Sequence, residues 1–223
     1  MFRVLTVASE CGSGGSIIAK MVAQTLGWRL LDRELIEAVA RTAQVDTETV
    51  GRYDEHVDSW WHRFNRGGLE AAAIYAGVPP ASAQLFDAEA VAALTRQVIS
   101  EAAETGSCVI VGRGAQCVLR NRPGVLHVFV YGPWRERASR VRGRPRSVCN
   151  VGELIQLRDQ ERASYIRTYY GCDWKDPHLY QMIISSHIGL ENVARLIVEA
   201  VLRADGPPSA RCMACTGFGS QSS

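Results

Sequence analysis

The sequence predicts an α/β fold in which a five-stranded parallel sheet carries helices on both faces. Three observations support this prediction. Short apolar runs alternate along the chain with longer segments whose apolar residues recur at helical spacing. The third apolar run is continuous, as expected for a strand buried on both faces of a sheet. The first run passes through a glycine-rich turn directly into an amphipathic helix, so we expect ligands to gather at the carboxyl ends of the strands.

Five apolar runs are assigned to strands. The first contains β-branched residues, the second ends at Asp32, and the third is a continuous apolar run of the kind buried in parallel sheets. The expected strands are 3–8, 28–31, 107–111, 125–131 and 181–185.

Helices are expected between these strands. After the first strand, apolar residues recur on one helical face at Ile17, Ile18, Met21, Val22 and Leu26. The other expected helices are 34–43, 88–104, 134–141, 151–169 and 190–203.

The connection between the second and third strands, residues 33–106, is too long for a plain crossover. We interpret residues 46–87 within it as an inserted, mobile helical region that grips a second substrate. One domain is expected over residues 1–204. Residues 205–223 are small, polar and rich in glycine, so we expect them to form a disordered tail.

The charge composition narrows the class of ligand. A net charge of +2 over 223 residues argues against general nucleic-acid binding. Lysine occurs only at Lys20 and Lys175, whereas arginine is abundant. Because the planar guanidinium group suits phosphate oxygens, this composition favours a small phosphorylated ligand.

The cysteines and the apolar runs indicate the compartment. Seven cysteines, an odd number, are read as reduced thiols. Cys212 and Cys215 form a Cys-x-x-Cys pair, but no second pair completes a zinc site. The first apolar run is too short for a secretory signal, and no run has the length of a membrane span. We therefore expect a cytoplasmic protein without a membrane partner; the sequence gives no oligomeric state.

The turn after the first strand has the composition of a phosphate-binding loop. Gly12, Gly14 and Gly15 can adopt backbone angles closed to other residues, so successive N–H groups can point at an anion on the positive end of the next helix. The pattern Gly-x-x-x-x-Gly-Lys-Ser/Thr is matched only in half, since Ser9 stands at the first glycine and Gly15 at the lysine. A tight turn without a ligand is the alternative interpretation.

Four blocks of sequence, residues 12–15, 28–36, 109–115 and 169–174, occur in the order and spacing of a known family. Together they resemble the cytidylate kinase-like family, relatives of bacterial cytidylate kinase among the P-loop nucleoside monophosphate kinases. The resemblance implies a P-loop NTPase-type core with a helical, monophosphate-binding insertion and an arginine-bearing lid, here residues 134–150.

The resemblance also implies a function. The protein would use ATP and Mg²⁺ and move the γ-phosphoryl group of ATP to a nucleoside monophosphate such as CMP. In cytidylate kinases proper, an aspartate stands on each side of the glycine and arginine that match Gly112 and Arg113, whereas this chain has Val111 and Gly114 there. Two alternatives therefore stay open: a kinase for another small metabolite, and a non-catalytic nucleotide-binding or sensing protein.

Phosphoryl transfer requires two anions to be positioned and the charge of the transition state to be spread. The loop is expected to bind the cofactor through the backbone groups of Gly12, Ser13, Gly14, Gly15 and Ser16.

A metal site and a catalytic cation are expected beside the loop. Ser16 and Asp32 are the candidate Mg²⁺ ligands, and Asp32 is also a candidate catalytic acid, although it equally suits a helix N-cap. Lys20 lies one helical turn after Ser16 and is the candidate replacement for the absent lysine; a solvated surface lysine is the alternative. On this basis, Gly15→Lys is expected to leave any kinase activity unchanged or to raise it.

Arginines in the expected lid crowd the stretch after the fourth strand. Arg140 is expected to bind the cofactor, and Arg142 and Arg144 to act as catalytic cations that close over the polyphosphate. A solvated basic helix is the alternative interpretation.

Three further arginines are candidate substrate-binding residues. The resemblance places Arg113 on the phosphate of the acceptor. Arg158 and Arg162 are spaced i, i+4, so both guanidinium groups can face one ligand. Ion pairs within the helix, with Asp159 or Glu161, are the alternative.

Overall fold

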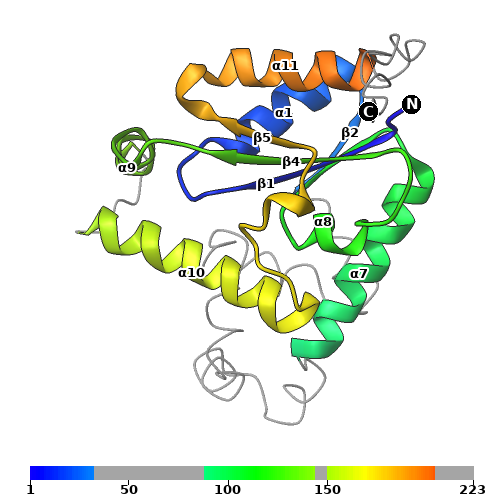
Figure 1. The fold of residues 1–223 in the computed structure, drawn as a ribbon, viewed down its shortest axis with the longest axis horizontal. Helices are drawn as coiled ribbons and strands as arrows, with labels where there is room; N and C mark the ends of the chain where they lie inside the picture. The colour runs from blue at the N-terminus through cyan, green and yellow to red at the C-terminus, as the bar shows by residue number, and fades with distance from the viewer. Residues whose placement is uncertain (33–87, 144–149, 204–223) are drawn as a thin grey trace, which may run out of the picture.

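The computed structural model describes residues 1–32, 88–143 and 150–203, which contain a sheet of five parallel strands in the order β2-β3-β1-β4-β5 (Figure 1). The strands are β1 (Val4–Ser9), β2 (Arg29–Leu31), β3 (Cys108–Val111), β4 (Val125–Tyr131) and β5 (Met182–Ser185). The predicted α/β class is confirmed, and each predicted strand is found to within one residue at either end.

Helices connect the strands in the order that the sequence predicts. They are α1 (Gly15–Leu26), α7 (Ala88–Thr105), α8 (Ala115–Val118), α9 (Trp134–Arg142), α10 (Val151–Tyr170) and α11 (Leu190–Arg203), with short 3₁₀ helices η1 (Pro177–Leu179) and η2 (Ser186–Ile188). The sequence does not predict α8, η1 and η2, because three or four residues are too few to show a helical period. None of the described helices is both long and apolar enough to cross a membrane.

Several predicted segments lie outside the described residues. They are the helix expected at 34–43, the insertion at 46–87, the later part of the expected lid at 144–149 and the tail at 205–223. Their boundaries and roles stay predictions.

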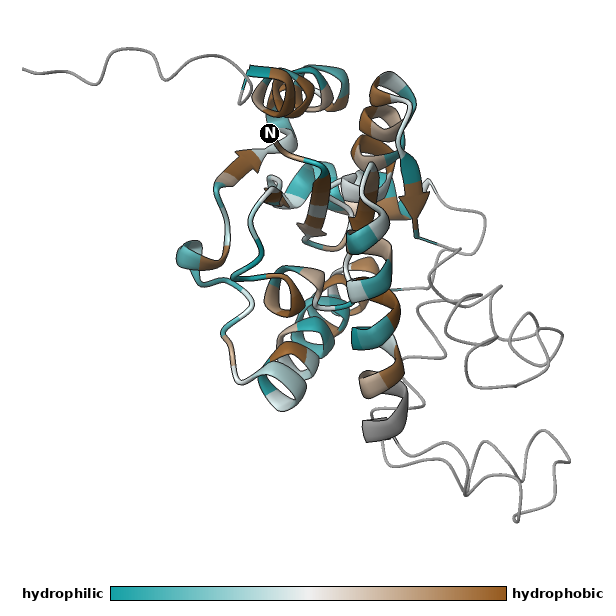
Figure 2. Cartoon of the chain, turned by 90° about the vertical axis from the view of Figure 1, so that its right-hand side faces the viewer, coloured by the Kyte–Doolittle hydropathy of each residue, from teal (hydrophilic) through white to brown (hydrophobic). Residues whose placement is uncertain are grey.

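Two apolar layers enclose the sheet, because alternate residues of a strand point to opposite faces. Leu5 packs with Ile18 of α1 and Ile197 of α11 on one face, and all three are fully buried. On the other face, Ile110 packs with Ile99 of α7 and with α8. The strands are largely brown between these layers in Figure 2. Burying an aliphatic side chain of this size stabilises the fold by roughly 1.5–3 kcal/mol.

The carboxyl ends of the strands define the functional edge of the sheet. Strand β1 is central, with β3 on one side and β4 on the other. Strands β2 and β3 are therefore added on one side of β1, and β4 and β5 on the opposite side. Ligands of open α/β sheets bind at such a switch point. The loop from β1 to α1 and the loop from β3 to α8 both leave this edge, and α9 lies beside the first of them (Figure 1).

Candidate functional site

The loop between β1 and α1, residues 10–14, is a glycine turn pressed against α9. Gly12 and Gly14 adopt the left-handed conformation, with φ of +79° and +90°. That conformation costs a residue with a Cβ about 1–2 kcal/mol. A Cβ on Gly12 would also lie 2.6 Å from the carbonyl oxygen of Arg137. Glycine at position 12 therefore allows the backbone of α9 to pack directly on the loop.

Helix α1 begins without a side-chain cap. Gly14 stands at the cap position, and the first turn contains no acidic residue. The first bond of the helix joins the N–H of Ile18 to the Gly14 carbonyl at 3.0 Å, which leaves the N–H groups of residues 15–17 without an intrahelical acceptor. Ser16 is exposed at the same end. These N–H groups and the positive end of the helix dipole suit an anion.

Ser13 differs from the other loop residues. Its N–H and its hydroxyl both donate to the Glu10 carbonyl, at 3.1 Å and 2.8 Å, and its side chain is fully buried. The candidate N–H donors to an anion are therefore those of Gly12, Gly14, Gly15 and Ser16. The N–H of Ser13 closes the turn instead.

Three guanidinium groups of α9 and α10 bind carbonyls of β1 and its loop. The bonds run from Arg162 to the Ser9 oxygen (3.1 Å), from Arg137 to the Cys11 oxygen (2.8 Å) and from Arg140 to the Gly12 oxygen (3.2 Å). A trans peptide points its C=O and the following N–H in opposite directions. Tying these carbonyls to the helices therefore fixes where the neighbouring N–H groups point.

A charge network joins the same loop to both helices. Arg137 pairs with Glu10 at 3.0 Å and with Asp159, and their side chains are only 8%, 11% and 15% exposed. Asp159 also accepts the N–H of Cys11 at 2.8 Å. From the solvent side, Lys175 approaches Glu10 at 3.3 Å. The buried carboxylates are thus paired, as buried charges need to be.

Gly15 stands at the lysine position because Ser9 occupies the neighbouring space. A Cβ on Gly15 would lie 2.3 Å from the Ser9 Oγ and 2.4 Å from its Cβ. A side chain at this position collides with Ser9 unless the loop moves. The expected effect of Gly15→Lys on kinase activity stays a prediction. The two departures from the P-loop pattern, at positions 9 and 15, compensate each other sterically.

The loop between β3 and α8 presents Arg113 at the same edge of the sheet. Gly112, Arg113 and Gly114 are all left-handed, with φ of +67°, +58° and +74°. The Tyr170 hydroxyl donates to the Arg113 carbonyl at 3.2 Å, and a Cβ on Gly114 would lie 2.3 Å from the Tyr170 ring. The end of α10 therefore supports this loop and holds the backbone of Arg113.

Tyr165 and Tyr170 form a hydroxyl pair behind Arg113. Their oxygens are 3.2 Å apart and their rings meet edge to face at 5.7 Å between centroids. Burial raises the pKa of Tyr165, against the opposing charge of Arg113, and burial also raises the pKa of Tyr170. Both hydroxyls are therefore neutral at physiological pH and serve as hydrogen-bonding groups.

The remaining predicted residues are distributed around this edge. Lys20 on α1 and Arg142 at the end of α9 are exposed. Asp32 is half-buried after β2, which β3 separates from β1, so the two strand axes lie roughly 10 Å apart. Arg158 is half-buried on α10. Arg144 lies outside the described residues.

Arg140 and Arg162 make contacts that the sequence did not assign to them. Besides the Gly12 carbonyl, Arg140 binds Glu136 at 3.0 Å and the Ser186 hydroxyl at 3.2 Å. Arg162 pairs with Asp159 at 3.3 Å within α10. The intrahelical ion pair left open by the sequence is thus present, and it does not exclude a ligand because the Arg162 side chain is 37% exposed.

A sequence model of the cytidylate kinase-like family matches residues 4–188, which is most of the chain and includes both loops. The chain belongs to the cytidylate kinase-like family. The predicted resemblance is therefore confirmed. No curated protein sequence matches this member of the family.

Solved structures support the fold. An uncharacterized protein from Eubacterium ventriosum ATCC 27560 is 21% identical, with a TM-score of 0.64 and coverage of 90% of this chain and 98% of the other. Shikimate kinase from Acinetobacter baumannii, in complex with shikimate, is 15% identical, with a TM-score of 0.52 and coverage of 93% and 97%. Shikimate kinase from Bacteroides thetaiotaomicron is 16% identical, with a TM-score of 0.52 and coverage of 90% and 98%.

Membership of this family supports a nucleotide-binding phosphotransferase. It also suggests the use of ATP and Mg²⁺. Among the described residues, no cluster of three or more His, Cys, Asp and Glu side chains forms a metal site of its own. The described cysteines, Cys11, Cys108, Cys117 and Cys172, are free thiols.

Sequence reasoning missed the residues that shape the two loops. Asp159 was considered only as a partner within its own helix, and Tyr170 only as part of a family block. Arg137 was one of many arginines in the expected lid. The signal that singles out Arg137 is burial, since it is a buried arginine whereas Arg142 is exposed. Burial of that kind follows from helix packing and is not visible in spacing.

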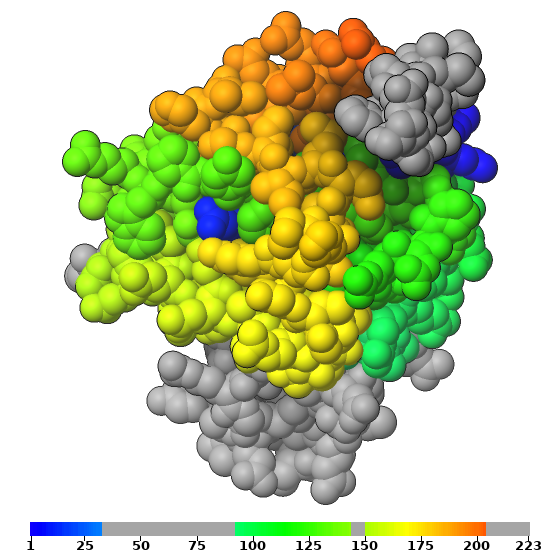
Figure 3. All heavy atoms as spheres, viewed as in Figure 1, coloured from blue at the N-terminus to red at the C-terminus, as the bar shows by residue number. Residues whose placement is uncertain are grey.

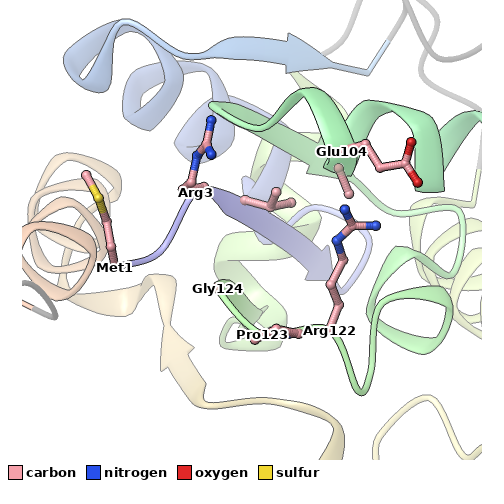
Figure 4. Close-up of a pocket in the computed structure, with 8 residues that line it drawn as sticks. Met1, Arg3, Glu104, Arg122, Pro123 and Gly124 are labelled. Atoms are coloured by element: carbon pink, nitrogen blue, oxygen red, sulfur yellow. The ribbon is translucent and has the colours of Figure 1, made fainter.

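An open pocket of about 580 Å³ lies at the opposite edge of the sheet (Figure 4). Arg3, Glu104 and Arg122 line it with the turn at Gly124, next to the start of β1. It is therefore at the amino ends of the strands, away from both loops, and takes no part in the candidate site.

Proposed function

We propose that this protein is an ATP-dependent kinase that transfers the γ-phosphoryl group to a nucleoside monophosphate, with CMP as one candidate acceptor. The observation that supports this most strongly is the uncapped N-terminus of α1 behind a glycine turn, at the same sheet edge as the loop that carries Arg113. One loop offers N–H groups to a polyphosphate, and the other offers a guanidinium group to an acceptor phosphate.

The donor side is assigned to the β1–α1 loop. The N–H groups of Gly12 and of residues 14–17 bind the phosphates, and the Ser16 hydroxyl and the Asp32 carboxylate would hold Mg²⁺. Mg²⁺ commonly binds through one or two protein oxygens plus substrate phosphates, which fits this sparse donor set. When bound, Mg²⁺ neutralises charge on the phosphates. Lys20, Arg142 and Arg144 supply the cations that the loop lacks.

The acceptor side is assigned to the β3–α8 loop and to α10. Arg113 binds the acceptor phosphate with a charge-assisted hydrogen bond, while Arg158 and Arg162 bind the remaining polar groups of the acceptor. The Tyr170 bond to the Arg113 carbonyl orders the loop before the acceptor arrives. Ordering in advance lowers the entropic cost of binding.

A non-catalytic nucleotide-binding protein is the second candidate. The contact of Ser9 with Gly15 favours it, because the loop has no room for the lysine that would stabilise the transferring phosphoryl group. A kinase for another small metabolite is a variant of the first candidate, and shikimate belongs among the acceptors to test because two similar folds are shikimate kinases.

A coupled ADP-release assay with Mg²⁺·ATP tests the proposal against a panel of nucleoside monophosphates and shikimate. The proposal predicts turnover that depends on one monophosphate. Turnover on shikimate alone would show that the acceptor is another small metabolite and not a nucleoside monophosphate. Tight nucleotide binding without ADP release for any acceptor would support the non-catalytic candidate instead.

A further inference from the structure

The loop between β1 and α1 is held from outside by one arginine and one aspartate. We propose that Arg137 and Asp159 are positioning residues that grip Cys11 by its carbonyl and its N–H and thereby fix the loop in its nucleotide-binding shape. We call this pair of contacts the Cys11 clasp. The proposal rests on the proposed function of the loop and adds two residues to it that touch neither nucleotide nor acceptor.

The geometry of the clasp is two-sided. Arg137 donates its Nε–H to the Cys11 oxygen at 2.8 Å, and Asp159 accepts the Cys11 N–H at 2.8 Å. The clasp is closed by the ion pair between Arg137 and Asp159. Two consecutive peptide groups are thus fixed, the one that enters Cys11 and the one that leaves it. Since peptides are planar and trans, the Gly12 N–H must point away from Arg137, into the turn.

The contacts of the clasp are largely buried and use the whole guanidinium group of Arg137. Arg137 uses all three of its guanidinium nitrogens, on Cys11, Glu10 and Asp159. A flexible ammonium group could not reproduce this planar fork. Glu10 in turn accepts the Gly132 N–H at 3.3 Å. Removing Arg137 or Asp159 leaves a charged or polar partner buried and unpaired, which costs more than the net value of the bond itself.

Packing around Cys11 agrees with this role. The Cys11 side chain lies in an apolar cluster with Ala138 and Val141 of α9 and Val151 and Ile155 of α10. Figure 3 shows blue atoms of the N-terminal segment as a small area between green and yellow segments and again at the upper right edge. The apolar cluster therefore packs Cys11 against both helices that carry the clasp.

The clasp reduces the conformational freedom of the loop before a ligand binds. Left-handed glycines at positions 12 and 14 leave the unliganded chain many alternative conformations, which a ligand would have to remove at an entropic cost. A loop already fixed at Cys11 binds its ligand without that cost. Loss of the clasp is therefore expected to weaken nucleotide affinity even where the rest of the fold is intact.

The test measures the dissociation constant of Mg²⁺·ATP by calorimetry well below the melting temperature. Asp159→Ala and Arg137→Lys are each expected to weaken binding roughly tenfold or more. Asp159→Asn keeps an oxygen for the Cys11 N–H, so it is expected to recover part of the loss, and it decides the matter if Asp159→Ala does not fold. In the double variant Arg137→Lys with Asp159→Ala, the fold-loss of affinity is expected to be smaller than the product of the two single fold-losses, because both substitutions disrupt the same clasp.

A matched control separates positioning from stability. Thr6→Val removes the buried bond between Thr6 and His127, 2.7 Å long and inside the sheet, so it lowers stability without touching the clasp. It is expected to bind Mg²⁺·ATP as the wild type does. If Asp159→Ala, Asp159→Asn and Arg137→Lys also bind with the wild-type dissociation constant, or if Thr6→Val weakens binding as much as they do, the positioning role is overturned.

Amide hydrogen exchange of the free protein supplies a readout that needs no nucleotide. The Cys11 N–H is expected to be protected in the wild type and in Thr6→Val, and to lose protection in Asp159→Ala. Equal protection in all three would overturn the clasp itself. If the wild type binds no nucleotide, the proposed function fails and the positioning role fails with it, while the exchange result still decides whether Asp159 holds Cys11.

Discussion

The two loops at the functional edge have similar backbone conformations, but different kinds of side chain hold them in place. Both leave a central parallel strand, both turn through left-handed residues, and both enter a helix behind a left-handed glycine, Gly14 or Gly114. The β1–α1 loop is held by guanidinium and carboxylate groups on its own backbone atoms. The β3–α8 loop is held by the Tyr170 ring and hydroxyl.

This difference matches the ligands proposed for the two loops. Charged groups that bind carbonyls orient the N–H groups between them, which is what a loop needs when its backbone binds phosphate. The Tyr170 ring supports the β3–α8 loop by packing against its backbone, so the side chain of Arg113 is left to bind the ligand. One loop therefore works through backbone N–H groups, and the other through the side chain of Arg113.

The largest expected effect concerns the charge that the first loop lacks. Lys20→Ala or Arg142→Ala is expected to lower kcat by about 10³-fold or more, because donors aimed at developing phosphoryl charge contribute effects of this size. Steady-state ADP release measures it. The control is Arg203→Ala, which removes the same charge from an exposed arginine at the end of α11, far from the loop. Robust turnover without both Lys20 and Arg142 would contradict the assignment.

The second prediction separates the two loops by ligand. Arg113→Ala is expected to weaken acceptor binding by about 2–5 kcal/mol while ATP binding is kept, because a desolvated charge pair to the acceptor phosphate is lost. Calorimetric titrations with each ligand measure the two affinities. An equal loss of both affinities, in a protein with an unchanged circular dichroism spectrum, would place Arg113 on the donor side or in a structural role.

The third prediction compares two glycines of one loop. Gly112→Ala is expected to destabilise the fold by about 1–2 kcal/mol from backbone strain alone, since a Cβ there meets nothing within 4 Å. Gly114→Ala adds a collision with the Tyr170 ring and is expected to cost about 1–3 kcal/mol more. Urea unfolding measures both. Equal losses of unfolding free energy in the two variants would show that the Tyr170 ring does not pack closely against this loop.

The fourth and smallest effect is a pH dependence of the unfolding free energy that comes from His127, in the sheet beneath both loops. Burial lowers the pKa of His127 below the ordinary histidine value of about 6.5. The unfolded chain therefore binds the proton first as pH falls, so this contribution to stability is complete above pH 6.5 and is lost below it. The expected slope is at most about 1.4 kcal/mol per pH unit. His127→Gln is expected to flatten it, and an unchanged slope in urea unfolding would contradict the assignment.

Most of the fold was predictable from the sequence because its strands and longer helices are read from local apolar patterns. Strand β4 and helix α11 are found with the predicted boundaries, Val125–Tyr131 and Leu190–Arg203. The order of the strands in the sheet, β2-β3-β1-β4-β5, comes from the structure and not from these local patterns. Helix α8 was missed because four residues between two loops carry no period of their own.

The site was predictable only where it depends on neighbours in the chain. The glycine turn and the arginine after β3 are visible in sequence, because each stands next to its strand. The bond from Cys11 to Asp159 joins residues 148 positions apart, and it exists only because α9 and α10 pack over the loop. The collision of Gly15 with Ser9 likewise depends on the shape of the turn.

A backbone NMR titration with a non-hydrolysable ATP analogue and Mg²⁺ tests the division between the two loops most directly. The account predicts that amide resonances of Gly12 and residues 14–17 shift first, and that those of residues 112–114 shift only when a monophosphate is added. Nucleotide at a hundredfold excess over its dissociation constant should also raise the unfolding free energy by about 2.7 kcal/mol. Shifts centred on residues 112–114 with nucleotide alone, or no shift and no stabilisation, would contradict it.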